Sequence, residues 1–169
     1  MQLKNIDKAI YRKRLNIVIV GFISTLLLLA LIFGQLLIMS FGEEGANNFK
    51  FNLLGVILSL LACMAILHSI KTSEFFKEIY YVWQVKQVQN LIFRKLKKIK
   101  VAAKDFEHDA LLILSFYYQS QQQVYQLDDN TLTITTVNKD LNDLQDVIAE
   151  QNITINVEQF DKKLLSAYS

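Results

Sequence analysis

The fold is decided by residues 51–104, which read FNLLGVILSLLACMAILHSIKTSEFFKEIYYVWQVKQVQNLIFRKLKKIKVAAK. Phe51 to Ile70 carries no formal charge, whereas Lys71 to Lys104 carries nine Lys or Arg against two Glu. About 20 apolar residues in a helix cross a hydrocarbon core of about 30 Å, and the uncharged half has this length. No Pro interrupts the stretch. Its pattern of charge and apolar residues therefore predicts a transmembrane helix over 51–70 and a basic amphipathic juxtamembrane helix over 71–104.

A second uncharged run lies upstream, from Leu15 to Gly42. It is longer than the apolar region of a signal peptide and lacks a clear cleavage pattern, so we expect a retained span over 15–41. The polar residues GEEGANNFK, 42–50, predict a short extracytoplasmic turn, and the two spans together a helical hairpin. Residues 1–14 form a basic lead that we expect to lie at an anionic membrane face.

Charge is strongly segregated along the chain. Residues 1–104 hold 15 basic and 5 acidic side chains, and residues 105–169 hold 3 basic and 11 acidic ones. Lys and Arg flank the outer ends of both spans, so the positive-inside rule predicts that both termini are cytoplasmic. We expect 105–169 to be a small acidic cytosolic region with helices over 106–127 and 131–151. A final helix with a cap at Thr154 or Asn156 is favoured, with a short strand over 153–157 as the alternative.

Small residues recur at four-residue intervals in both predicted spans. This spacing lets helix backbones approach closely, which favours packing of the two spans or self-association. The residues expected at this contact are Gly55, Ser59, Cys63, Ala30 and Gly34.

One face of the basic helix is apolar and forms a seam that needs a partner. The seam consists of Tyr81, Val85, Val88, Ile92, Leu96 and Ile99. The helix over 106–127 has apolar residues around much of its circumference, so we expect it to fold back antiparallel on the seam. The seam also stands as a candidate surface for a partner protein.

The other side of the basic helix carries a cluster of cations. Three interpretations stay open: contact with anionic phospholipid, contact with RNA or the ribosome, and a solvated face. The cations are Arg94, Lys95, Lys97, Lys98, Lys100 and Lys104.

The sequence predicts no catalytic, cofactor-binding or metal site. His68 and His108 are the only histidines, and Cys63, the only cysteine, lies within a predicted span. There is no Gly-rich phosphate loop and no metal-ligand spacing. The predicted spans contain no Asp, Glu, Lys or Arg, which argues against a transporter or pump.

Four stretches resemble a family of small, uncharacterised two-span inner-membrane proteins of gamma-proteobacteria, classed as a domain of unknown function. They are NLLGVILSLLACMAILHSIK (52–71), KEIYYVWQVKQ (77–87), RKLKKIK (94–100) and LSFYYQSQQQVYQLDDNTLT (114–133). The resemblance implies a bacterial inner membrane and adds no activity or catalytic residue.

These observations predict an all-α membrane protein without enzymatic activity. The first hypothesis is a membrane-anchored interaction protein, an accessory or scaffold subunit whose cytosolic helices bind a partner. The alternative is a tether that binds ribosome, RNA or anionic lipid through residues 94–104.

Overall fold

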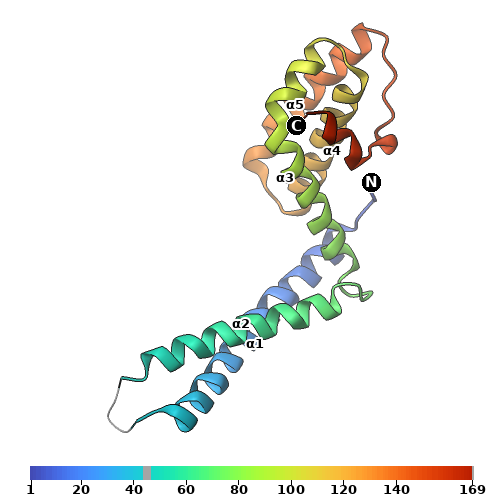
Figure 1. The fold of residues 1–169 in the computed structure, drawn as a ribbon. Helices are drawn as coiled ribbons and strands as arrows, with labels where there is room; N and C mark the ends of the chain where they lie inside the picture. The colour runs from blue at the N-terminus through green and yellow to red at the C-terminus, as the bar shows by residue number, and fades with distance from the viewer. Residues whose placement is uncertain (44–46, 169) are drawn as a thin grey trace. The chain divides into compact units, whose positions relative to one another are not determined.

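The computed structural model describes residues 1–43 and 47–168, and every regular element in this part of the chain is a helix, which confirms the all-α prediction (Figure 1). The elements are α1 (Lys8–Phe41), α2 (Phe49–Ile70), α3 (Lys77–Lys104), α4 (His108–Leu127), α5 (Thr131–Glu150) and the 3-10 helices η1 (Val157–Gln159) and η2 (Lys162–Tyr168). The centre of the predicted turn, residues 44–46, lies outside the described residues.

The chain divides into two compact units. The span unit comprises Lys13–Tyr80, and the tail unit comprises Met1–Arg12 with the described residues from Tyr81 onward. The boundaries between the units fall within α1 and α3.

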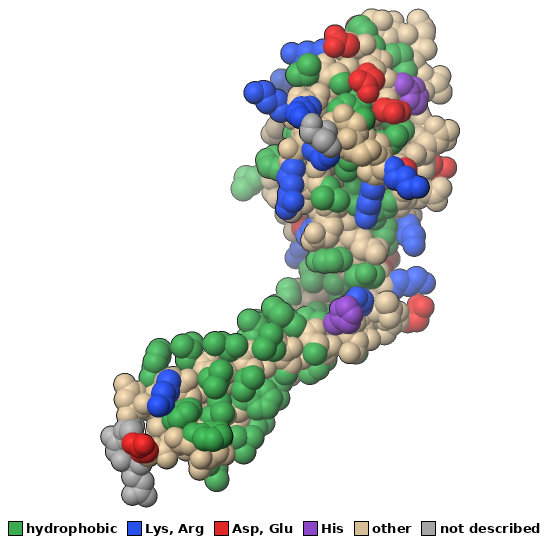
Figure 2. Space-filling model, viewed as in Figure 1, with side chains coloured by type: hydrophobic (Ala, Val, Ile, Leu, Met, Phe, Trp, Pro, Cys, Tyr) green, Lys and Arg blue, Asp and Glu red, His purple; other side chains and the backbone are tan. Residues whose placement is uncertain are grey.

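The span unit contains two helices that are long and apolar enough to cross a membrane. The most apolar windows of α1 and α2 have mean hydropathies of 2.8 and 2.4, and only 6% and 17% of them is buried. A core helix of a soluble protein would be mostly buried, whereas these helices expose Leu, Ile and Val along their length (Figure 2). Such a surface suits a lipid environment.

The basic helix begins later than predicted. Residues 71–76 form turns, in which Ser73 N donates to Ile70 O and Phe76 N donates to Ser73 O. The helix α3 then begins at Lys77, with Glu78 in its first turn, where a carboxylate favours the positive end of the helix dipole. α2 and α3 are therefore separate helices.

The core of the tail unit is built around α4. This helix buries residues on all its sides, as a helix that is apolar over much of its girth must do. Seam residues Val88, Ile92 and Ile99 of α3 share one apolar core with α4 and α5, and the Phe116 ring of α4 stacks on Phe160 with centroids 3.9 Å apart.

The two helices α3 and α4 pack antiparallel, as expected. Tyr81 Oη donates to Gln123 Oε1 at 3.3 Å, and Gln89 Nε2 donates to Ser120 Oγ at 3.1 Å, so later residues of α3 meet earlier residues of α4. The connection is short because Phe106 adopts φ 57°, a left-handed conformation common after a helix C-terminus.

α5 lies where a helix was expected, but the segment after it is not the predicted single helix. α5 is capped by Asn130, whose side-chain oxygen accepts from Thr133 N, and its stripe residues Val137 and Leu141 are buried. After α5, Asn156 Oδ1 accepts from Glu158 N at 3.0 Å, but the helix that it caps is only the short η1. η2 follows separately, and no strand occurs among the described residues.

Candidate partner-binding site

A groove opens on the tail unit between the C-terminal end of α3, α4 and α5. Its volume is about 480 Å³. Its floor contains Ala103, Leu111 and Leu114, which are 8%, 0% and 4% exposed. Val147 of α5 also lines the groove and is 37% exposed, so a side chain entering the groove meets an apolar surface.

The two rims of the groove carry opposite charges. Lys100 and Lys104 lie one helical turn apart on α3, and Lys100 Nζ lies 5.8 Å from the centroid of the Tyr118 ring. The other rim belongs to α5 and carries Asp140, Asp143 and Glu150. An apolar floor between a basic and an acidic rim is the form of a groove that accepts an amphipathic helix.

The sequence analysis identified Lys100 and Lys104 as candidate contacts to anions but did not predict that they lie near α5. Asp140, Asp143 and Glu150 follow one another at spacings of three and seven residues, which places them on one helix face. This spacing can be read from the sequence and indicates an acidic helix face. The sequence does not show the register in which α3 packs beside α5, so it does not place this face near Lys100 and Lys104.

The remaining predicted cations lie on other parts of α3. Arg94, Lys97 and Lys98 are exposed. Lys95 is only partly exposed, because its Nζ donates to Leu165 O at 2.8 Å and so holds η2 against α3. The six predicted cations therefore do not form one surface.

The seam is buried inside the tail unit. Tyr81, Val85, Val88, Ile92 and Ile99 are 6% exposed or less, and Leu96 is partly buried against the same core. The partner that the seam needs is α4 of the same chain. This corrects the expectation that the seam is a surface for another protein, because its apolar area is already removed from water.

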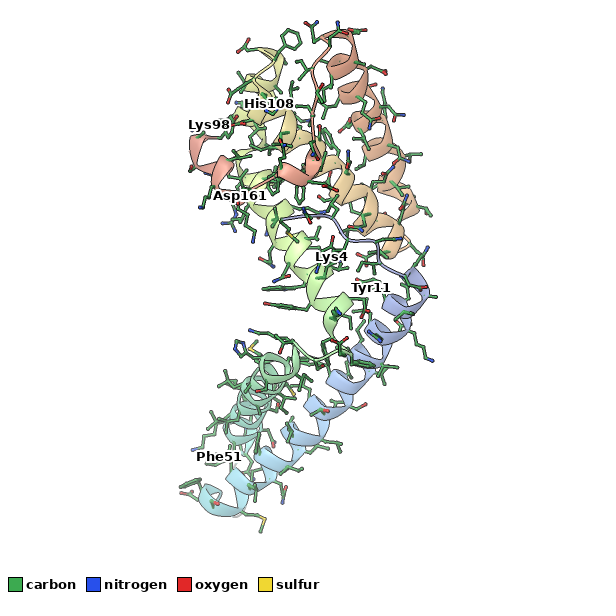
Figure 3. The ribbon with its side chains drawn as sticks, turned by 90° about the vertical axis from the view of Figure 1, so that its right-hand side faces the viewer. Lys4, Tyr11, Phe51, Lys98, His108 and Asp161 are labelled. Atoms are coloured by element: carbon green, nitrogen blue, oxygen red, sulfur yellow. The ribbon has the colours of Figure 1, made fainter. Side chains whose placement is uncertain are left out.

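The N-terminal segment is held by an acidic turn between α4 and α5. Tyr11, which is labelled in Figure 3, donates its hydroxyl hydrogen to Asp128 Oδ1 at 3.0 Å, while Lys8 and Arg12 form ion pairs with Asp129. Residues 1–12 thus pack on the tail unit. The physical reason is that the turn supplies carboxylates of opposite charge together with a buried site for the Tyr11 ring, which is 2% exposed.

Further hydrogen bonds fasten the same segment. Lys4 N donates to the Tyr81 hydroxyl at 2.7 Å, and Gln123 Nε2 donates to Lys4 O at 2.5 Å. Lys86 Nζ of α3 also donates to Asp128, at 2.6 Å. Sequence analysis missed this cluster because Lys8 and Tyr11 lie 121 and 117 residues before their partners Asp129 and Asp128. The available signal was that Lys8 and Arg12 share a helix face and that Asp128 and Asp129 are adjacent.

We predict that Lys8→Met raises the pKa of the Asp129 carboxyl. The hydrogen bond from Lys8, with the charges of Lys8 and Arg12, holds this pKa below its ordinary value of 3.8. Because the folded-state pKa is lowered, the ion pair stabilises docking above the ordinary pKa and is lost as pH falls through the folded-state pKa. NMR titration of the carboxyl carbon should show Asp129 protonating at higher pH in Lys8→Met and unchanged in Lys139→Met. An unchanged titration in Lys8→Met would contradict the contact.

Two tyrosines of the tail unit are ionised less readily than an exposed phenol. Burial raises the pKa of Tyr81. Burial also raises the pKa of Tyr168, whose hydroxyl donates to Glu107 Oε1 at 2.5 Å and would repel that carboxylate if ionised. Both phenols therefore act as neutral groups: Tyr81 accepts from Lys4 N of the N-terminal segment, and Tyr168 of η2 donates to Glu107.

In the span unit, the small residues lie where α1 and α2 meet. Gly55, Ser59 and Cys63 are buried on α2, and a Cβ atom at Gly55 would lie 2.5 Å from Gly34 N and 3.1 Å from Ala30 O. The two backbones are thus in direct contact at Gly34 and Gly55. A small apolar pocket of about 230 Å³ lies between the same helices beside Cys63.

No group of three or more His, Cys, Asp or Glu is placed to hold a metal ion within residues 1–43 and 47–168. His68 lies near Lys71 Nζ, at 3.1 Å, and His108 lies 3.7 Å from Asp109 (Figure 3). Each contact is local and exposed, and the two histidines belong to different units.

Comparison with known proteins identifies one relationship. A family model described as "Protein of unknown function (DUF3087)" matches residues 1–165. No match was found among curated proteins or solved structures. The family match agrees with the resemblance carried by the four stretches between residues 52 and 133.

Proposed function

The chain belongs to the DUF3087 family of proteins of unknown function, and we propose that it is a membrane-anchored interaction protein whose tail unit binds a partner. The partner contributes an amphipathic helix to the groove between α3, α4 and α5. In this proposal the protein is an accessory or scaffold subunit of a larger complex in a bacterial inner membrane.

The anchoring part of the proposal is a two-span hairpin. α1 and α2 are long and apolar enough to cross a bilayer, and Gly34 lies against Gly55. The count of Lys and Arg at the outer ends of the spans favours cytoplasmic termini. The tail unit then faces the cytoplasm, where soluble and membrane-bound partners are both accessible.

We propose a binding rather than a catalytic role on the basis of the residues present. The two histidines are exposed and contact neighbours in sequence, and the one cysteine lies between the apolar helices. The acidic side chains of the groove form a rim rather than a convergent set. Catalytic sites bring a nucleophile, a base and a charge-stabilising group within hydrogen-bond reach of one another.

The observation that carries the proposal is the groove itself. Its buried apolar floor supplies the surface that a partner's apolar stripe removes from water, and its rims set the partner's orientation. The matching helix presents acidic side chains towards Lys100 and Lys104, and basic side chains towards Asp140, Asp143 and Glu150. Such charge complementarity contributes mainly to specificity and association rate.

Val147→Asp should reduce recovery of the partner by at least about tenfold, because it places an unpaired carboxylate in the apolar part of the interface. The measurement is a gentle-detergent pull-down of the tagged full-length protein from native membranes, followed by quantitative mass spectrometry after a high-salt wash. The matched control is Leu132→Asp, on the same helix at a side chain that is 91% exposed and outside the groove.

The supporting result is a stoichiometric, salt-resistant protein that wild type and Leu132→Asp retain and Val147→Asp loses. Once it is identified, Lys100→Glu with Lys104→Glu should weaken binding, and reversal of the partner's facing acidic residues should restore it. Equal recovery by Val147→Asp and wild type would rule out the groove as the binding site. Ribosomal proteins that are lost in high salt would instead favour the tether hypothesis.

A further inference from the structure

The outer face of α3 combines exposed apolar side chains with cations. This face lies opposite the buried seam. Trp83 and Val101 are about five helical turns apart and therefore lie on the same side of the helix. Its apolar members are Trp83, Leu91, Phe93 and Val101, which are 53%, 41%, 64% and 57% exposed.

Cations occupy the same face between these apolar residues. Arg94, Lys97 and Lys98 are exposed and lie on the turns between Trp83 and Val101. Asp105 and Glu107 line a hollow with Lys97 and Lys98 at the C-terminal end of the face. The part of the face around Arg94 has no acidic residue of α3 beside it, since the acid of this helix is Glu78 in its first turn.

Exposed large apolar side chains on a folded surface indicate a site that is covered in use. The seam residues of α3 are buried in the core that α3 shares with α4, but Phe93 and Val101 lie on the opposite side of the helix and are more than half exposed. An occupant must therefore supply an apolar phase and negative charge together. An anionic bilayer surface supplies both, because headgroup phosphates lie directly above the acyl boundary.

We propose that the outer face of α3 binds the surface of an anionic phospholipid bilayer. Trp83, Phe93 and Val101 enter the acyl boundary, while Arg94, Lys97 and Lys98 contact headgroup phosphates. RNA is the weaker candidate, because aliphatic side chains such as Leu91 and Val101 gain nothing from a phosphate backbone. This inference rests on the proposed membrane anchoring, since only residues 71–76 separate α2 from α3.

Trp83 is the only tryptophan in the chain, so its fluorescence reports on this face without labelling. The experiment reconstitutes the full-length protein in vesicles of phosphatidylcholine alone or of phosphatidylcholine with phosphatidylglycerol. With phosphatidylglycerol present, we expect blue-shifted Trp83 emission, quenching by brominated phospholipid and protection from acrylamide. In neutral vesicles, or in high salt, we expect emission typical of an exposed tryptophan.

Arg94→Gln, Lys97→Gln and Lys98→Gln together should remove the effect of phosphatidylglycerol. A cation near an anionic surface contributes enough that losing three lowers the ratio of bound to unbound α3 by about 100-fold. The matched control replaces three exposed cations elsewhere on the tail unit, Lys139, Lys162 and Lys163, with Gln and should keep the wild-type response. All these side chains lie at the surface, and circular dichroism verifies that both triple variants are folded.

The experiment distinguishes a failure of the membrane-anchoring proposal from a failure of the proposal that α3 binds anionic lipid. Flotation of the protein with vesicles of either composition reports membrane anchoring, whereas Trp83 reports α3 alone. Trp83 emission that does not depend on phosphatidylglycerol would overturn the lipid assignment even when the protein floats. Protection of Trp83 by added RNA in neutral vesicles, without protection by phosphatidylglycerol, would overturn it in favour of nucleic acid.

Discussion

Ile92→Asp is expected to unfold the tail unit. Ile92 is fully buried in the core that joins α3, α4 and α5, so its replacement places a carboxylate where no basic partner is available. An unpaired buried charge combined with a lost apolar side chain costs more than about 4 kcal/mol, which is comparable to the whole stability of a small domain. Thermal melting of the full-length protein in mild detergent, followed by circular dichroism and limited proteolysis, should show loss of the tail helices.

The adjacent residue provides the control. Leu91 is 41% exposed on the outer face, so Leu91→Asp should leave the tail unit folded. Melting of Ile92→Asp at the wild-type temperature would show that the seam is accessible to another protein, as the sequence alone allowed. If the unit unfolds, loss of a partner in a seam variant is a consequence of unfolding, and the groove variants become the specific test.

Gly55→Ala is expected to destabilise the pair formed by α1 and α2. The added Cβ atom would lie 2.5 Å from Gly34 N and 2.7 Å from Gly34 Cα. Both atoms belong to the backbone, so relief requires the helices to separate. Overpacking of this kind costs about 1–3 kcal/mol, which outweighs the gain in helix propensity of about 1 kcal/mol except at the lower end of that range. We expect that upper end because no flexible side chain can yield.

Cys63 reports the separation directly. It is the only cysteine and is 2% exposed between the two helices, so reaction with a fluorogenic maleimide during heating follows their opening. Gly55→Ala should lower the temperature at which Cys63 reacts. Gly21→Ala is the matched control, because a Cβ atom there has nothing within 4 Å and should leave that temperature unchanged or raise it. Equal melting of the two variants would contradict close packing at Gly55.

The groove and the outer face of α3 divide the basic helix into three surfaces. One side is the buried seam, the end near Lys100 and Lys104 forms a rim of the groove, and the side with Arg94, Lys97 and Lys98 faces away. Binding of a bilayer by the last surface leaves the groove for a protein partner. The two proposals are therefore compatible, and their tests use different residues.

The helices themselves could be predicted from the sequence because their signals are local. The uncharged runs and the apolar seam of α3 each depend on residues within a few turns of one another, and the structure contains the corresponding helices. The cap of α5 is Asn130, one residue before the stretch in which a cap was expected. The antiparallel return of α4 was also predictable, since a short turn joins two apolar faces. The break at residues 71–76 was left undecided by the sequence, because Thr72 or Ser73 could cap a new helix while nothing in the composition forbids a continuous one.

Tertiary packing alone decided where the charges lie. The sequence contains a basic N-terminal part and an acidic C-terminal part, but only the fold brings Lys8 and Arg12 to Asp129, or Lys100 and Lys104 opposite Asp140. The same packing turned the seam into core and placed residues 1–12 on the tail unit. Helix periodicity is encoded within one turn, whereas the pairing of distant charges depends on the register and direction in which whole helices pack.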